Sequence, residues 1–215
     1  GRFTVLASDS FTLTGYTLQG FALEQNASDV YCDFGEEVIM AQLAFDKGMN
    51  VGSEQSQTII LYAVWKANNF TVKYVGGQSI KGVRATGSVA DSEFTYDQDA
   101  NLSSNGFRLV GYTFAGWSYN GKTYTENENV KNLLSQNGAE ATFTAVWEQN
   151  TYTVSYNAGY EGGVAPQSQT FTYDAETNIL AGAITRPGYD FVGWTTSILA
   201  VSKEYDALEN VANKL

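Results

Sequence analysis

Pairs of carboxylates are the residues whose type and spacing come closest to a catalytic or metal-binding pattern in this sequence. They occur at Glu36 and Glu37, at Asp97 and Asp99, and at Glu126 and Glu128. A glycosidase uses two carboxylates that face each other across a cleft, and a calcium loop needs more oxygen ligands within about a dozen residues than any of these pairs supplies. We therefore interpret the pairs as parts of solvated turns and helix starts, and we predict neither a catalytic residue nor a metal ligand.

The other reactive side chains exclude several common mechanisms. The 215 residues contain no histidine, so the chain lacks the imidazole base of the usual Ser-His and Cys-His nucleophiles. Cys32 is the only cysteine, which excludes an intrachain disulfide and a zinc site built from His and Cys. The glycine-rich stretch 159–163 lacks the Lys-Ser/Thr pair of a phosphate-binding loop. We predict a protein that is not an enzyme and uses no cofactor, with Cys32 as a buried apolar residue.

The elements that position these side chains are organised by internal repetition. A heptad of glycines and aromatic residues occurs three times, as GYTLQGF at 15–21, GYTFAGW at 111–117 and GYDFVGW at 188–194. Other blocks return in the same order, with FTVKY at 70–74 matching 152–156, FTYD at 94–97 matching 171–174, and LYAVW at 61–65 matching 143–147. This pattern predicts three small repeats, 1–68, 69–149 and 150–215, the first incomplete at its start and the third at its end.

Each repeat is expected to combine strands with one short helix, an α+β fold. The recurring blocks alternate aromatic or β-branched residues with small or polar ones, which is typical of strands in an antiparallel or mixed sheet. Helices are expected after the heptad, from Glu36 to Lys47 in the first repeat and at 130–134 in the second, capped by Asn127 or Asn129. In the third repeat, Asp206 and Glu209 have capping-box spacing and predict a helix toward Leu215.

The repeated blocks resemble the Listeria-Bacteroides repeat family, also known as the internalin B-repeat. The match is close at 111–117, 145–147, 152–156, 171–173 and 186–194. The resemblance implies tandem small β-grasp-like (ubiquitin-like) repeats from a multidomain bacterial cell-surface or secreted protein, where such repeats serve as stalks, spacers or adhesive modules. The first repeat departs from the family pattern with Phe21 in place of Trp and a longer segment at 35–56, and the second carries an additional stretch at 79–91.

Aromatic residues divide into those that recur and those that do not. The Trp or Phe that ends each heptad and the heptad Tyr recur at fixed positions, so we assign them to the thin cores of small repeats. A packing residue is expected in every copy, whereas a residue that contacts a partner is not. Tyr119 and Tyr124 flank a predicted hairpin turn at Asn120-Gly121, and Tyr160 lies in the glycine-rich loop. These three tyrosines lack counterparts and are our candidates for partner contact.

Charge and composition complete the functional expectation. The net charge of −11 argues against nucleic acid and anionic membrane surfaces as partners, and the sequence has no run of about 20 apolar residues that would insert into a membrane. We expect a non-catalytic region of an extracellular protein, secreted or at the bacterial cell wall, that acts as spacer, stalk or adhesion module toward a host or neighbouring-cell protein or glycan. Two alternatives stay open: a carbohydrate-binding module, supported by the aromatic content alone, and an accessory domain of a secreted hydrolase.

Overall fold

A computed structural model of the chain describes residues 1–7, 9, 11–50, 52, 58–180, 184–197 and 202–211. The chain divides into two compact units. The first contains Gly1–Val75, Val89–Ser104 and Tyr119–Thr144, and the second contains Gly76–Ser88, Asn105–Ser118 and Ala145–Leu215. The junction between the first and second predicted repeats therefore lies inside the first unit, and the junction between the second and third lies inside the second unit.

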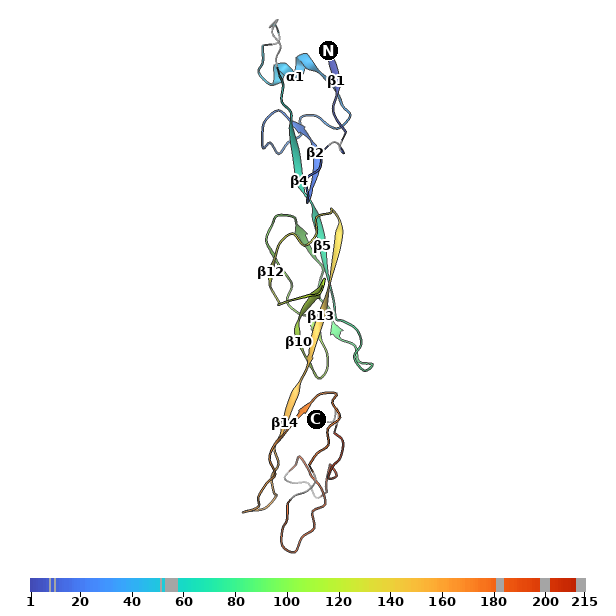
Figure 1. The fold of residues 1–215 in the computed structure, drawn as a ribbon, viewed down its shortest axis with the longest axis vertical. Helices are drawn as coiled ribbons and strands as arrows, with labels where there is room; N and C mark the ends of the chain where they lie inside the picture. The colour runs from blue at the N-terminus through green and yellow to red at the C-terminus, as the bar shows by residue number, and fades with distance from the viewer. Residues whose placement is uncertain are drawn as a thin grey trace. The chain divides into compact units, whose positions relative to one another are not determined.

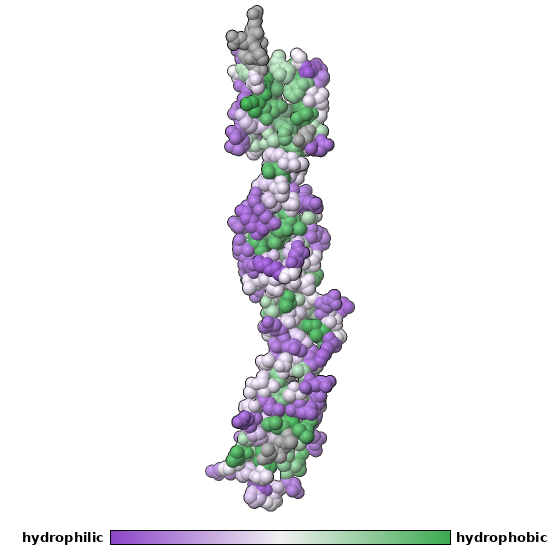
Figure 2. Space-filling model, in the orientation of Figure 1, coloured by the Kyte–Doolittle hydropathy of each residue, from purple (hydrophilic) through white to green (hydrophobic). Residues whose placement is uncertain are grey.

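The first repeat is built from two antiparallel strand pairs and one helix (Figure 1). Strand β1 (Arg2–Thr4) pairs with β3 (Glu37–Ile39), and β2 (Tyr16–Ala22) pairs with β4 (Tyr62–Ala67). The register of β2 shifts between Leu18 and Gly20, which marks a β-bulge within the heptad. Helix α1 (Met40–Asp46) follows β3 directly. Figure 2 shows apolar residues gathered at the surface near α1, where Phe45 is 69% exposed.

The second repeat contains a five-stranded mixed sheet in the order β11-β10-β13-β5-β7. Its strands are β5 (Asn69–Val75), β7 (Ser92–Thr95), β10 (Tyr112–Tyr119), β11 (Lys122–Tyr124) and β13 (Ala139–Gln149). The opening strand β5 is parallel to the closing strand β13 and antiparallel to β7. Asn120 and Gly121, with φ of +48° and +78°, form the predicted turn between β10 and β11.

Two further strand pairs complete the second repeat, and one pair lies in the third. Strand β6 (Thr86–Gly87) pairs with β9 (Phe107–Arg108), and β8 (Ala100–Asn101) pairs with β12 (Asn129–Val130). In the third repeat, β14 (Thr151–Val154) pairs antiparallel with β15 (Gln169–Thr172). The recurring blocks thus form the strands that their alternation predicts, except for the third heptad at 188–194, where Tyr189 and Trp194 form isolated bridges only.

The aromatic residue that ends each heptad is a core residue, as predicted. Trp117 is completely buried and Phe21 is 5% exposed, while Trp194 packs, partly buried, against Phe171 and its neighbours. Cys32 is 2% exposed and lies in the core of the first repeat, which confirms its prediction as a buried residue. These large rings supply much of the buried area because each repeat is too small for a deep core.

The prediction of one helix per repeat is wrong. Among the described residues only the first repeat contains an α-helix; in the second repeat, strand β12 ends at Val130 and residues 131–134 form neither helix nor strand. In the third repeat, residues 206–209 form a turn, and Leu215 at the end of the expected helix lies outside the described residues. The protein is therefore mostly β, with one short described helix.

The capping-box spacing that predicted a helix at Asp206 and Glu209 closes a turn instead, and the same spacing closes a turn in the other two repeats. The side chains of Glu36, Glu128 and Glu209 each accept a hydrogen bond from the backbone N–H three residues earlier, at 2.8–2.9 Å. The residue before each glutamate has a positive φ: Gly35 at +68°, Asn127 at +57° and Leu208 at +63°. A left-handed residue is incompatible with a right-handed helix at that point, so the same side-chain contact stabilises a turn in all three repeats.

Candidate functional site

One asparagine connects each repeat to the next. Asn68 lies between β4 and β5 and is 6% exposed. Its backbone N–H donates to the Gly15 carbonyl at 2.9 Å, and its carbonyl accepts from the Tyr96 N–H at 2.8 Å. Its side-chain Oδ1 accepts a hydrogen bond from Thr17 Oγ1 at 2.5 Å. The linker residue therefore joins the heptad of the first repeat to the FTYD block of the second.

Direct contacts between the two blocks surround this linker. The Tyr16 hydroxyl donates to Asp97 Oδ2 at 2.8 Å, and the Tyr16 and Tyr96 rings meet edge to face with their centroids 5.8 Å apart. A Cβ atom added to Gly15 would lie 2.1 Å from the Tyr96 ring, and Gly15 has a φ of +80°. Glycine is required here both by the backbone conformation and by the ring that covers it. We call Gly15, Tyr16, Thr17, Asn68, Tyr96 and Asp97 the first joint.

A second joint repeats this arrangement between the second and third repeats, with Gly111, Tyr112, Thr113, Asn150, Tyr173 and Asp174 in the corresponding positions. The linker N–H to glycine carbonyl distance is again 2.9 Å, and the tyrosine N–H to linker carbonyl distance is again 2.8 Å. The threonine to asparagine, tyrosine to aspartate and ring centroid distances are 2.6, 2.7 and 5.7 Å. Corresponding distances in the two joints agree within 0.1 Å, so the same residues produce the same geometry twice.

In the first joint, the acid and the tyrosine stabilise each other in their neutral-pH forms. Hydrogen bonds to Asp97, first from Asn132 and then from Tyr16, lower the pKa of this carboxyl. The hydrogen bond to Asp97 raises the pKa of Tyr16. In the second joint, burial, followed by the hydrogen bond to Asp174, raises the pKa of Tyr112. The first joint therefore favours a carboxylate paired with a protonated phenol, and the second favours a protonated Tyr112.

The two joints differ in what supports the aspartate. In the first, Asn132 donates its side-chain N–H to Asp97 at 2.8 Å and accepts from the Asp97 backbone N–H at 2.6 Å. In the second, Asp174 is 8% exposed, and Lys81 Nζ donates to its backbone carbonyl. Lys81 belongs to the additional stretch 79–91 of the second repeat. This insertion therefore braces the second joint.

The placement of the heptad tyrosine in a repeat core is wrong. Tyr16 and Tyr112 contact the linker and the Tyr-Asp pair of the following repeat, because the turn at the preceding glycine directs them away from their own core. Sequence reasoning did not find the joints, although one signal was available. The GYT, linker Asn and FTYD blocks occur together at both junctions.

Two of the predicted contact residues cover a core ring of the second repeat. Tyr119 stacks on Phe143 with centroids 4.7 Å apart, and Tyr124 contacts the same ring edge-on at 5.3 Å. Lys122 Nζ lies 3.9 Å from the centroid of the Tyr124 ring. Both tyrosines are half-buried. The structure thus gathers them at one place, over Phe143.

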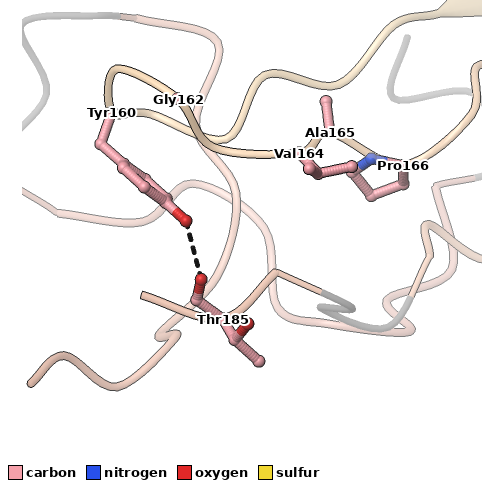
Figure 3. Close-up of a pocket in the computed structure, with 6 residues that line it drawn as sticks. All are labelled: Tyr160, Gly162, Val164, Ala165, Pro166 and Thr185. Atoms are coloured by element: carbon pink, nitrogen blue, oxygen red, sulfur yellow. Dashed lines mark hydrogen bonds between the residues drawn. The ribbon is translucent and has the colours of Figure 1, made fainter. Parts of the chain in front are cut away.

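The third predicted contact residue, Tyr160, lines an open hollow of about 260 Å³ in the third repeat. Figure 3 shows its hydroxyl pointing at the Thr185 carbonyl, a hydrogen bond of 2.8 Å, with Val164 and Pro166 on the loop that continues past the hollow. The Arg186 guanidinium lies 5.2 Å from the Tyr160 ring centroid. The hollow offers a ring edge, a proline and backbone carbonyls, but no carboxylate pair.

The carboxylate pairs occupy structural positions. Glu36 and Glu128 close turns, and Asp97 belongs to the first joint. In the described part of the chain, no group of three or more His, Cys, Asp or Glu residues is arranged to hold a metal ion. The described residues also include no helix of the length and apolar character needed to cross a membrane.

Comparison with known proteins identifies the repeat. The Listeria-Bacteroides repeat domain matches residues 70–137 and 152–214, which together are more than half of the chain. The chain belongs to the Listeria-Bacteroides repeat family. The joints link the two matched copies to each other, and link the first of them to the divergent repeat that precedes it. No solved structure matches the chain.

Two relatives from Evansella cellulosilytica share part of this Listeria-Bacteroides repeat sequence. One is named "Putative membrane protein" and is 33% identical over 151 residues, covering 67% of this chain and 20% of the relative. The other is named "Putative Gly-rich membrane protein" and is 30% identical over 148 residues, covering 66% of this chain and 15% of the relative. The chain thus spans a fifth or less of the length of either relative.

Proposed function

We propose that this chain is a non-catalytic spacer region of a bacterial cell-surface or secreted protein, in which the joints hold consecutive repeats at a fixed geometry. The observation that carries the proposal is the agreement of the two joints, contact by contact, within 0.1 Å. Membership of a bacterial repeat family and the membrane-protein names of two relatives support the location.

The linker chemistry fits a spacer better than a flexible connection. A Gly- or Ser-rich linker leaves its backbone free, so the distance between its ends varies widely. Here the linker is short, and the N–H, C=O and side chain of its asparagine are all hydrogen-bonded. Buried polar groups that lose their partners cost free energy, so rotation about the linker is opposed. A spacer at a cell surface needs this resistance to folding back.

The strand order supports a β-grasp-like repeat as part of the same proposal. In the second repeat, the opening strand β5 is central, pairs antiparallel with the next strand β7, and lies parallel to the closing strand β13. Because β13 ends at Gln149 and β14 begins at Thr151, the closing strand of one repeat runs into the opening strand of the next. This arrangement places one joint at each of the two junctions between repeats.

Spin labels on either side of the first joint test the spacer function. Labels at Ser28→Cys and Thr123→Cys lie in the two repeats that this joint connects. Background labelling at Cys32 is expected to be low because the thiol is buried and burial raises its pKa. A fixed joint gives one narrow distance distribution, and Tyr96→Ala, which removes the ring over Gly15, broadens it.

The matched control is Gln98→Ala, an exposed change next to the joint, which should leave the distribution narrow. A distribution that is already broad in the unaltered joint would rule out a fixed-geometry spacer.

A second candidate function, contact with a surface protein or glycan, is favoured by the hollow at Tyr160. Tyr119 stacks on Phe143 and Tyr124 contacts the same ring edge-on, whereas Tyr160 lines a hollow. A glycan array and a binding screen with the chain and its Tyr160→Ala variant test this function. Binding that the variant loses supports adhesion, whereas no binding above background leaves the spacer as the sufficient explanation.

A further inference from the structure

We propose that the turn Arg186–Tyr189 in the third repeat is a docking face for another repeat of the same kind. The part of that repeat that docks is a linker residue together with a Tyr-Asp turn, which correspond to Asn150 and to Tyr173 with Asp174 in the second joint. The inference rests on the proposed function, because it assumes that the joint is the connection between consecutive repeats. The surface is the turn itself, and Asp190 beside it determines which hydrogen-bonding group the docked segment must present.

The docking face is already formed in the third repeat. The Tyr189 N–H donates to the Arg186 carbonyl at 3.1 Å, and the corresponding turns before Tyr16 and Tyr112 close at the same distance. The φ of Gly188 is +77°, compared with +80° and +78° at the glycines of the two joints. The backbone therefore adopts the joint conformation without an occupant, so docking requires no rearrangement of this turn.

The same face is open, unlike its two counterparts. Among the described residues, a Cβ atom added to Gly188 meets nothing within 4 Å, whereas one added to Gly111 would lie 2.1 Å from the Tyr173 ring. Tyr189 is 65% exposed. Its ring is held from one side by Arg186, whose guanidinium lies 3.9 Å from the centroid. Gly188 and Tyr189 thus present an uncovered glycine beside an exposed, oriented tyrosine. The first and second joints would present the same surface if the following repeat were removed.

The two occupied joints define the occupant. The aromatic ring of the occupant would cover Gly188, and its carboxylate would accept a hydrogen bond from the Tyr189 hydroxyl. The N–H of its linker residue would donate to the Gly188 carbonyl. These are the contacts of Tyr173, Asp174 and Asn150 in the second joint. The face therefore fits a linker and Tyr-Asp turn of this repeat type.

Asp190 sets one further requirement on the occupant. It stands where Thr17 and Thr113 donate their hydroxyls to the linker asparagine Oδ1. A carboxylate accepts hydrogen bonds and does not donate them, so it would repel a carbonyl oxygen in that place. The linker side chain that docks here must present a donor, either an amide turned to offer its N–H or a hydroxyl or ammonium group.

The second joint allows the third-repeat face to be tested within the existing chain. Val110→Pro together with Thr113→Asp gives the second joint the residues that flank Gly188 and Tyr189. Val110 is 70% exposed, and proline suits this turn position. Nitration mapped by mass spectrometry reports joint opening, because a hydroxyl bonded to a carboxylate reacts slowly. Tyr112 should remain at least tenfold less reactive than Tyr189 in this variant.

Gly111→Ala is the control that opens the second joint, and it should make Tyr112 as reactive as Tyr189. If the Val110→Pro, Thr113→Asp variant behaves in the same way, the third-repeat face does not support docking and the inference is overturned. If Tyr16 and Tyr112 are as reactive as Tyr189 in the unaltered chain, the joints themselves are open and the proposed function fails first. The two failures are therefore distinguishable.

A lengthened chain tests the occupant. Residues 135–215, added after Leu215 with tyrosine 189 of the added copy replaced by phenylalanine, supply a closing strand, a linker asparagine and a further Tyr-Asp turn while leaving a single Tyr189 to be read. Nitration of Tyr189 should fall to the level of Tyr112, and the fall should be lost when tyrosine 173 of the added copy alone is replaced by alanine. Continued reactivity of Tyr189, with the added residues folded by amide NMR dispersion, would refute the docking face.

Discussion

The three heptad glycines allow the free energy of a joint to be separated from backbone strain. Gly111 and Gly188 have the same left-handed φ, +78° and +77°, but only Gly111 is covered by a ring. Replacing either glycine with alanine places an L-residue in the left-handed region, which costs about 1–2 kcal/mol. The difference between the two variants therefore reports the contacts of the joint alone.

The additional loss expected at Gly111→Ala follows from the geometry. The new Cβ would lie 2.1 Å from the Tyr173 ring, so the ring must leave its position. The edge-to-face contact with Tyr112 contributes about 0.5–1.5 kcal/mol. The hydrogen bond from Tyr112 to Asp174 contributes about 1.5 kcal/mol, the lower end for a bond to a charged group, because it is partly solvated. Gly111→Ala should therefore destabilise the joint by about 2 kcal/mol more than Gly188→Ala destabilises its own turn.

Amide hydrogen exchange is the appropriate assay, because a chain of two units does not unfold in a single two-state transition. The Tyr173 N–H, which donates to the Asn150 carbonyl, reports opening of the second joint. The Tyr189 N–H, which donates to the Arg186 carbonyl, reports the Gly188 turn, where Gly188→Ala introduces the backbone strain alone. The acceleration of Tyr173 exchange in Gly111→Ala should be about 30 times the acceleration of Tyr189 exchange in Gly188→Ala, since each 1.4 kcal/mol corresponds to a factor of ten. Equal accelerations at the two reporters would mean that the ring and hydrogen-bond contacts contribute nothing, and would refute the reasoning.

Three further predictions concern the Lys81 hydrogen bond, the turn at Leu208 and the pH dependence of the first joint. Lys81→Met removes the hydrogen bond from Lys81 to the Asp174 carbonyl in the second joint. Amide exchange at the linker of the second joint should accelerate severalfold, while amide exchange at the linker of the first joint keeps its rate. Equal acceleration at both linkers would show that Lys81 does not support the second joint. Leu208→Asn should stabilise the turn at 206–209 by about 0.5–1 kcal/mol, measured as slower amide exchange of the Glu209 N–H, because leucine is strained at its φ of +63° and is 59% exposed. The pKa of Asp97 is lowered and that of Tyr16 is raised, so exchange protection of the first joint should be complete near neutral pH. It should fall as the pH drops through the folded-state pKa of Asp97 and as it rises through that of Tyr16. Asp97→Asn should abolish the acid limb and weaken the alkaline limb, because the hydrogen bond to Asp97 is the main cause of the raised Tyr16 pKa.

Local sequence pattern was a good guide to the strands and to the packing residues. The alternation in FTVKY and FTAVW predicts β5 and β13, and both form at those positions. Recurrence of a large ring at the end of the heptad correctly identifies Trp117 and Phe21 as core. These inferences succeed because strand formation and burial depend on which face a side chain occupies, and that face is set by neighbouring residues.

Local sequence pattern was a poor guide where the same spacing is compatible with both a helix start and a turn. The spacing of Asp206 and Glu209 is that of a helical capping box, yet the side-chain bond closes a turn. Leu208 lies between them with a left-handed φ, and leucine carries no sequence signal for that conformation. Asn127 in the second repeat is such a signal, because asparagine adopts left-handed conformations more readily than most residues.

By itself, the sequence determines that this protein is a tandem array of small strand-containing repeats, with no histidine and with a large ring at the end of each heptad. Only the tertiary structure shows that the preceding Gly-Tyr-Thr belongs to a joint. The physical reason is distance along the chain: Tyr16 bonds to a carboxylate 81 residues away and Tyr112 to one 62 residues away. No local periodicity records such a contact, and it exists because the linker asparagine brings the end of one repeat to the start of the next.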